Sequence, residues 1–252
     1  MNNPWPFDDP ARRDPRTIDE LFNAALCGPE EEAWQAVTAL DWNGSREVLE
    51  RATELCRSEC SFERCVGADV LGQLGVPERT YPERSAAVLL QMLAVEQCPE
   101  VLRSIFIGLG HLHDRRAISA AARFVGHPDG DVRHAVVLAL TGHEEPSAIE
   151  MLIGFTEDSD AHVRDWATFA LGAQIDLDTP AIRQALVDRL NDSDDETRGE
   201  ALRGLARLHD PRVLPALAKE LVSESFDSLA SQAEEMLVGT DLHARLIALM
   251  QR

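Results

Sequence analysis

The feature that most constrains this chain is a motif that occurs three times between Pro128 and Asp210. Each copy has a short acidic turn, an Arg, small and apolar residues at helical spacing, and a Leu before a small residue. The Arg residues are Arg133, Arg164 and Arg198, which lie 31 and 34 residues apart. A period of this length is typical of stacked helical repeats, in which each repeat packs on its neighbours. The sequence therefore predicts an all-α solenoid.

The alternation of helices and turns extends over most of the chain. Thr17 and Glu20 form a capping-box pattern ahead of the first helix, and Gly28-Pro29 and Asn43-Gly44 mark later breaks. No segment shows the period-two alternation of a strand. We expect about seven helix pairs and a final closing helix. The first pair lies within residues 17–40. The others are 46–57 with 61–74, 83–95 with 99–112, 115–125 with 131–140, 146–156 with 161–171, 180–190 with 195–208, and 211–222 with 226–238, and the closing helix is 241–250.

The first sixteen residues differ from the rest of the chain. Four prolines within residues 1–16 disfavour a regular helix and predict an extended N-terminal arm. Trp5 and Phe7 in this arm could cover the open end of the first repeat or bind a partner. Residues 17–252 are expected to form a single solenoid with a C-terminal capping helix.

Several short motifs resemble a known repeat family. The Val-Arg step at 132–133, the Leu-Gly step at 171–172 and the Asp-Pro-Arg junction at 210–212 are similar to HEAT repeats of the PBS-lyase-like type. The resemblance extends from about Thr17 to Val238. Within it, Val163–Ala170 and the acidic repeat that follows resemble bacterial HEAT proteins encoded beside Rhs toxin genes and regarded as immunity proteins. The resemblance implies a right-handed superhelix that binds another protein through its concave face, with a toxin as one such partner.

Charge narrows the kinds of partner. The chain has 24 Lys and Arg against 44 Asp and Glu, a net charge of −20. Such a charge favours basic partners and disfavours nonspecific binding to nucleic acid or anionic membranes. The sequence has no apolar run long enough for a transmembrane helix, no signal-peptide pattern at its start, and five Cys, which fit a reducing compartment. We expect a cytoplasmic monomer that binds a basic protein.

The repeated Arg column is expected to be structural. Arg133, Arg164 and Arg198 would form a ladder by bonding the acidic turns through Asp129, Asp160 and Asp194, because a guanidinium can hold a carboxylate and a carbonyl together. The alternative is a phosphate-binding row, which the surrounding acids disfavour. The acidic turns themselves could form a solvated edge or steer a basic partner.

The second helices of the pairs should line the concave face. Aligned on their buried Leu residues, they give two outward columns, the first with Val66, Ser104 and Ala135 and then Trp166. Trp166 and Phe169 project side by side, because residues three apart share a helix face. A shift of one residue in this alignment would place both in the core instead. The candidate partner-binding residues are Ile107, Leu138, Asp165, Trp166, Phe169, Glu200 and Arg203.

We find no pattern for catalysis, a metal or a cofactor. Cys56, Cys60 and Cys65 lack the paired spacing of a zinc site, and no HExxH or GxSxG motif is present. Two enzyme classes built on related repeats remain as alternatives. Phycobilin lyases need a bilin pocket that nothing here marks. DNA glycosylases of HEAT-like type would use Asp165 and Trp166, but their cleft must be basic.

Overall fold

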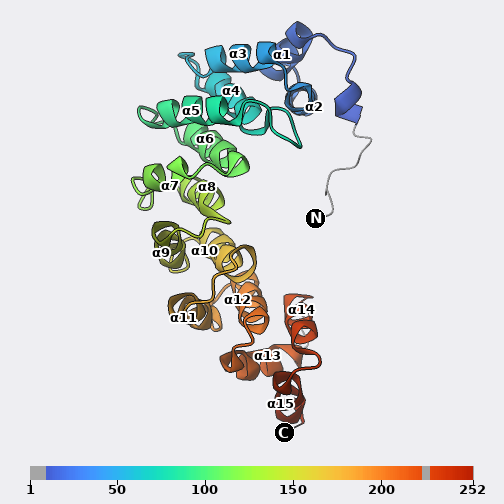
Figure 1. Cartoon of the computed structure of the whole chain (residues 1–252), viewed down its shortest axis with the longest axis vertical. Coiled ribbons are helices and arrows are strands. Elements are labelled where there is room, and N and C mark those ends of the chain that lie inside the picture. Colours follow the sequence, from blue (N-terminus) through green and yellow to red (C-terminus); the bar gives the residue numbers. More distant parts are fainter. Residues whose placement is uncertain (1–9, 223–227, 252) are drawn as a thin grey trace. The chain divides into compact units, whose positions relative to one another are not determined.

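The computed structural model describes residues 10–222 and 228–251, and every regular element in that part of the chain is helical (Figure 1). The chain divides into two compact units, Met1–Phe124 and Val125–Arg252. The predicted fold class, an all-α solenoid of helix pairs, is confirmed. Trp5 and Phe7, which were expected to cover the first repeat or bind a partner, lie outside the described residues.

Unit 1 contains three complete helix pairs. Its second helices form one row, in which α2 packs against α4 and α4 against α6, and each first helix packs on its partner. Phe22, Leu71 and Phe106 are among its fully buried side chains. The elements of this unit are the short 3-10 helix Pro10–Arg13, α1 (Ile18–Cys27), α2 (Glu30–Asn43), α3 (Arg46–Leu55), α4 (Ser61–Gln73), α5 (Pro82–Leu93), α6 (Pro99–Leu112) and α7 (Arg116–Ala121).

Unit 2 repeats the arrangement, with α8, α10, α12 and α14 packed in sequence as one row (Figure 1). Phe155, Leu171 and Leu205 are fully or almost fully buried in this unit. Its elements are α8 (Gly130–Leu140), α9 (Pro146–Phe155), α10 (Ala161–Phe169), a π-helical turn (Ala170–Gln174), α11 (Pro180–Arg189), α12 (Asp195–Arg207), the 3-10 helix Pro211–Val213, α13 (Leu214–Leu221), α14 (Ser228–Leu237) and α15 (Asp241–Met250).

The helix boundaries follow local sequence signals. The Thr17 side chain accepts from the Glu20 N–H while the Glu20 carboxylate accepts from the Thr17 N–H, so the predicted capping box is present. Asp129, Asp160 and Asp194 accept hydrogen bonds from the first N–H groups of α8, α10 and α12. Acidic residues therefore begin the second helices of three successive pairs.

Glycines allow two pairs of second helices to approach closely. A Cβ atom on Gly72 of α4 would lie 2.5 Å from the Cα of Gly108 of α6. In unit 2 a Cβ on Gly172 would lie 3.1 Å from the Cα of Gly204 on α12. These backbones touch because no side chain separates them.

Helix α7 is shorter than expected. The sequence predicts a helix over 115–125, but α7 ends at Ala121 and the chain then turns. After this turn the Phe124 ring packs edge-on against Phe106, with 5.1 Å between ring centroids. This contact fills the core of unit 1 where the rest of the helix was expected.

Candidate functional site

The Arg column forms a ladder between successive helix pairs of unit 2. Arg133 on α8 makes a two-pronged ion pair with Asp158, with Nε–Oδ2 and Nη2–Oδ1 distances of 2.7 Å. Arg164 on α10 pairs with Asp192 in the same way, at 3.0 and 2.8 Å. The Nη1 group of each Arg donates to a carbonyl in the turn before its own helix, that of His127 for Arg133 and that of Asp158 for Arg164.

The acid partners in this ladder are not the predicted ones. Asp129, Asp160 and Asp194 each cap their own helix, because an N-cap side chain is short and lies beside free backbone N–H groups. The carboxylate two residues earlier, Asp158 or Asp192, points to the Arg of the preceding pair. The prediction was therefore wrong about the acid, because the carboxylate that pairs with each of these Arg residues lies two residues before the predicted one.

Arg198 departs from the ladder pattern. Its Nη1 donates to the Asp192 carbonyl at 2.8 Å, as in the other two. Its carboxylate contacts are Asp195 on its own helix at 2.6 Å and Glu220 at 3.5 Å. The third Arg thus keeps the carbonyl bond but lacks the two-pronged pair.

A third two-pronged pair of this kind occurs in unit 1 and was missed in the sequence. Arg64 on α4 pairs with Glu96 at 2.7 Å and donates to the Ser58 and Glu59 carbonyls. Its position 69 residues before Arg133, close to two periods, is the signal that could have revealed it. The guanidinium groups of Arg64, Arg133 and Arg164 are thus engaged with protein groups, which argues against a phosphate-binding row.

Four aromatic rings form a continuous row on α8 and α10 of unit 2. The ring centroids of His134 and His162 are 4.3 Å apart, and that of Trp166 lies 5.4 Å from His134. Phe169 continues the row at 5.5 Å from Trp166 in an edge-to-face arrangement. The rings of His134, Trp166 and Phe169 are partly exposed, and His162 is exposed. The four rings therefore expose a rigid aromatic surface to solvent.

Acidic and basic side chains border this row. The Arg203 guanidinium on α12 lies 5.3 Å from the Phe169 ring centroid and pairs with Glu200. Burial raises the pKa of Asp165 to about 7, and the negative charges of Glu200, Glu196 and Asp194 add to this effect. We call this surface the aromatic–acidic face. It comprises His134, His162, Asp165, Trp166, Phe169, Glu196, Glu200 and Arg203.

The structure brings together only part of the predicted face. Trp166 and Phe169 lie side by side, but Ala135 of the first column is fully buried, as Ser104 and Val66 nearly are. These side chains are buried because the second helices pack against one another along that column. Leu138 is half-buried on α8 in unit 2, whereas Ile107 is half-buried on α6 in unit 1.

The sequence analysis missed the two histidines of the row. His162 precedes Trp166 by four residues, a spacing that places both on one helix face. His134 occupies the place in α8 that Asp165 occupies in α10, one residue after the ladder Arg. These two spacings could have placed both histidines beside Trp166 from the sequence.

The described residues hold no group of three or more His, Cys, Asp or Glu that could bind a metal ion. The five cysteines are unpaired by disulfides, and burial raises the pKa of Cys56 to about 12. Within residues 10–222 and 228–251, no helix is both long and apolar enough to cross a bilayer.

Comparisons with known proteins agree with this architecture. A family model for HEAT repeats matches residues 86–172 and 155–238. Protein YibA of Escherichia coli strain K12 is 25% identical over 226 residues, which cover 86% of this chain and 80% of YibA. The X-ray structure of Escherichia coli YibA superposes with a TM-score of 0.75 at 21% identity, covering 96% of this chain and 94% of YibA.

Two further solved structures share the fold at lower similarity. The complex of CpcE and CpcF of phycocyanin lyase from Nostoc sp. PCC7120 gives a TM-score of 0.52 at 18% identity and covers 100% of this chain and 98% of that one. The HEAT-like repeat protein of Thermococcus onnurineus NA1 gives 0.57 at 17% identity, with 93% and 99% covered. At these identities the likeness shows the fold alone.

Proposed function

The chain belongs to the HEAT-repeat family, and from this premise we propose that it is a non-enzymatic scaffold that binds another protein. The observation that carries the proposal is the aromatic–acidic face of unit 2. Partly exposed aromatic rings bordered by charge resemble the centre of protein interfaces, where Trp and Arg contribute most of the binding energy. The rings of this face are held by packing across α8 and α10, so binding would cost little side-chain ordering.

The charge of unit 2 supports a basic partner. Residues 125–252 carry 11 Lys and Arg against 24 Asp and Glu, whereas residues 1–124 carry 13 against 20. Burial raises the pKa of Asp165, and three neighbouring acids, Glu200, Glu196 and Asp194, raise it further. A cationic side chain placed beside Asp165 would relieve this repulsion and could stack on Trp166. The same acids would repel phosphates, so the face does not suit a DNA glycosylase.

Toxin neutralisation is the narrower form of this proposal. It rests on the sequence resemblance of Val163–Ala170, and it agrees with the acidic character of the face, because a basic toxin would be attracted to it. The identity of the captured partner decides between an immunity protein and a general adaptor. The CpcE and CpcF likeness extends to the fold only, so we do not assign this chain a lyase activity.

Affinity capture from a lysate of the native host tests the proposal. We expect the wild-type chain to retain a basic protein in near-stoichiometric amount, and Trp166→Ala to lose it. The matched control is Trp34→Ala, because Trp34 is 68% exposed on α2 of unit 1 and is not part of the face. Circular dichroism and melting curves of both variants verify that each remains folded.

A second variant separates binding from folding. Glu196 is exposed at the start of α12, so Glu196→Lys reverses a charge of the face without opening a cavity. We expect this variant to weaken capture as well. Equal capture by wild type, Trp166→Ala and Glu196→Lys would contradict the proposed face.

A further inference from the structure

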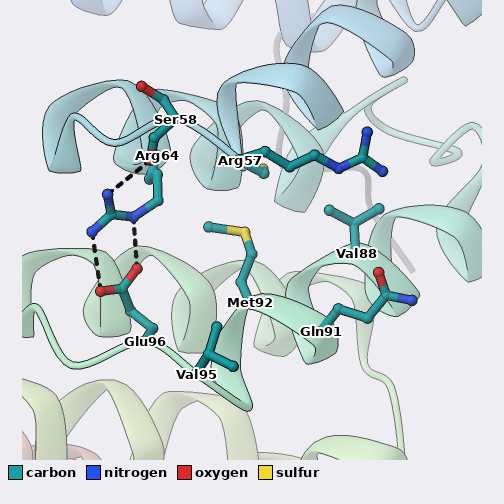
Figure 2. Close-up of a pocket in the computed structure, with 9 residues that line it drawn as sticks. Arg57, Ser58, Arg64, Val88, Gln91, Met92, Val95 and Glu96 are labelled. Carbon is teal, nitrogen blue, oxygen red and sulfur yellow. Dashed lines mark hydrogen bonds and ion pairs between the residues drawn. The ribbon is translucent and has the colours of Figure 1, made fainter.

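Unit 1 contains a cleft of about 400 Å³ that the proposed function does not use. It lies between the turn that follows α3 and the second half of α5 with the turn after it (Figure 2). Its volume is at the lower end of the range for ligand sites, and it is open to solvent. A cleft of this kind can hold one or two side chains of a larger partner.

The floor of the cleft is apolar. Met92 lies at its centre, with Val88 and Val95 beside it (Figure 2). Val95 lies in the turn after α5 and is 81% exposed, so its side chain is available to a ligand. Cys56 also lines the cleft, and because burial raises the pKa of its thiol to about 12, it adds an uncharged surface.

One end of the cleft is closed by an ion pair. The Arg64 guanidinium contacts both Glu96 carboxylate oxygens, at 2.7 and 3.1 Å, and donates to the Ser58 carbonyl (Figure 2). The Glu96 carboxylate also accepts from the backbone N–H groups of Gln97 and Cys98. Arg64 and Glu96 are therefore committed to the fold and leave no net charge for a ligand.

Arg57 is different, because its guanidinium is uncommitted. The side chain is exposed and extends over the Val88 and Gln91 side of the cleft (Figure 2). Among the described residues, no hydrogen bond or ion pair reaches the guanidinium, and the Gln91 amide, which lies on the same side of the cleft beyond Val88, is exposed (Figure 2). The cleft thus offers one free cation and one amide above an apolar floor.

This combination is particular to unit 1 and is not required by the repeat. Arg57 precedes the ladder Arg64 by seven residues, and the same position in the other ladder turns is Gly126, Glu157 and Asn191. Met92 precedes the ladder acid Glu96 by four residues, where unit 2 has Asp188 before Asp192. Because the repeat folds without Arg57 or Met92 at these positions, their chemistry is free to serve binding.

We propose that this cleft binds a peptide segment of a protein partner in which an aliphatic side chain lies next to a single carboxylate. The aliphatic group would pack on Val88, Met92 and Val95, and the carboxylate would pair with Arg57 and accept from Gln91. A phosphate dianion fits less well, because only one guanidinium is free and Glu96 lies in the same cleft. The site is independent of the aromatic–acidic face, which takes a cation.

The test uses the full-length chain and two blocked dipeptides, N-acetyl-Leu-Asp-amide and N-acetyl-Leu-Asn-amide, in NMR titrations of the backbone amides. We expect saturable shifts confined to residues 56–64 and 88–96 with the Asp peptide, and about tenfold weaker binding of the Asn peptide. Arg57→Gln should weaken binding of the Asp peptide by about the same factor. Lys219→Gln, an equal charge change at an exposed residue of unit 2, should leave it unchanged.

A further variant tests the apolar part of the cleft. Val95→Ser alters a side chain that is already exposed, so it should leave the fold intact and weaken both peptides equally. The proposal is overturned if the Asp peptide produces no saturable shifts at these residues. It is also overturned if both peptides bind wild type equally, or if Arg57→Gln binds the Asp peptide as well as wild type does. None of these outcomes bears on the face in unit 2.

Discussion

The ionisation of Asp165 should make the stability of the fold depend on pH. Burial raises its pKa in the folded chain to about 7, with the charges of Glu200, Glu196 and Asp194 as further causes, whereas an unfolded Asp titrates near 3.9. Between these values the folded state holds a proton that the unfolded state has lost, so stability falls as pH rises from about 4 to about 7. We predict that Asp165→Asn removes this loss and raises the Tm at pH 8 relative to wild type, with little difference at pH 4.

The measurement is a series of thermal melts from pH 4 to pH 8. Glu150→Gln is the control, because Glu150 is an exposed carboxylate on α9 outside the aromatic–acidic face. Its Tm difference from wild type should stay constant across the series. A constant difference for Asp165→Asn as well would show that Asp165 ionises normally in the folded chain.

At the same scale, single residues show how far the sequence could reveal the site. Trp166 and Phe169 were predicted to project side by side, because residues three apart on a helix share a face, and the structure places their rings 5.5 Å apart. Ala135 was expected on the outward column and is fully buried. Its burial depends on how closely α8 packs against α10, a tertiary property that helical spacing alone does not encode.

Close helix packing is the element-scale property that glycine substitutions can test. Gly72→Ala would place a Cβ 2.5 Å from the Cα of Gly108, so α4 and α6 would have to separate. We predict a loss of about 1–3 kcal/mol in the free energy of unfolding. Gly154→Ala is the matched control on α9, because a Cβ there meets nothing within 4 Å. Since Ala favours helix over Gly, this control should gain up to about 1 kcal/mol.

Urea denaturation of both variants measures the difference. A Gly72→Ala variant as stable as Gly154→Ala would mean that the α4–α6 contact adapts without cost.

Elements were more predictable than their mutual contacts. The starts of α11 and α15 follow from Thr179-Pro180 and from Thr240-Asp241, where a Thr with a capping hydroxyl precedes the helix. The ladder contacts were harder to predict, because Asp158 and Asp160 are both acidic residues of one turn. Only the three-dimensional path of the turn shows that Asp160 caps α10 and Asp158 reaches Arg133. A pattern of residue types cannot separate two carboxylates that lie two positions apart.

At the scale of the whole molecule, the property to test is whether all the repeats unfold in one cooperative transition. The sequence predicts a single solenoid over residues 17–252, while contacts group the chain into units 1–124 and 125–252. In repeat proteins stability is close to a sum of repeat and nearest-neighbour terms, so a defect in one interface can stay local. Removing one ladder residue would create such a defect, because Arg164 and Asp192 form a largely buried pair with side-chain exposures of 12% and 5%.

We predict that Arg164→Ala destabilises unit 2 by about 1–3 kcal/mol, because the buried Asp192 carboxylate loses its two-pronged partner and keeps only the Arg189 contact at 3.3 Å. Hydrogen exchange measured by mass spectrometry should show lost protection across α8 to α13 and retained protection in α1 to α6. Arg46→Ala, which removes an exposed pair with Glu50 on α3, should cost no more than about 0.5 kcal/mol. Equal loss of protection in both units would instead establish that all the repeats fold as one cooperative solenoid, because a defect in one interface would then have spread to every other.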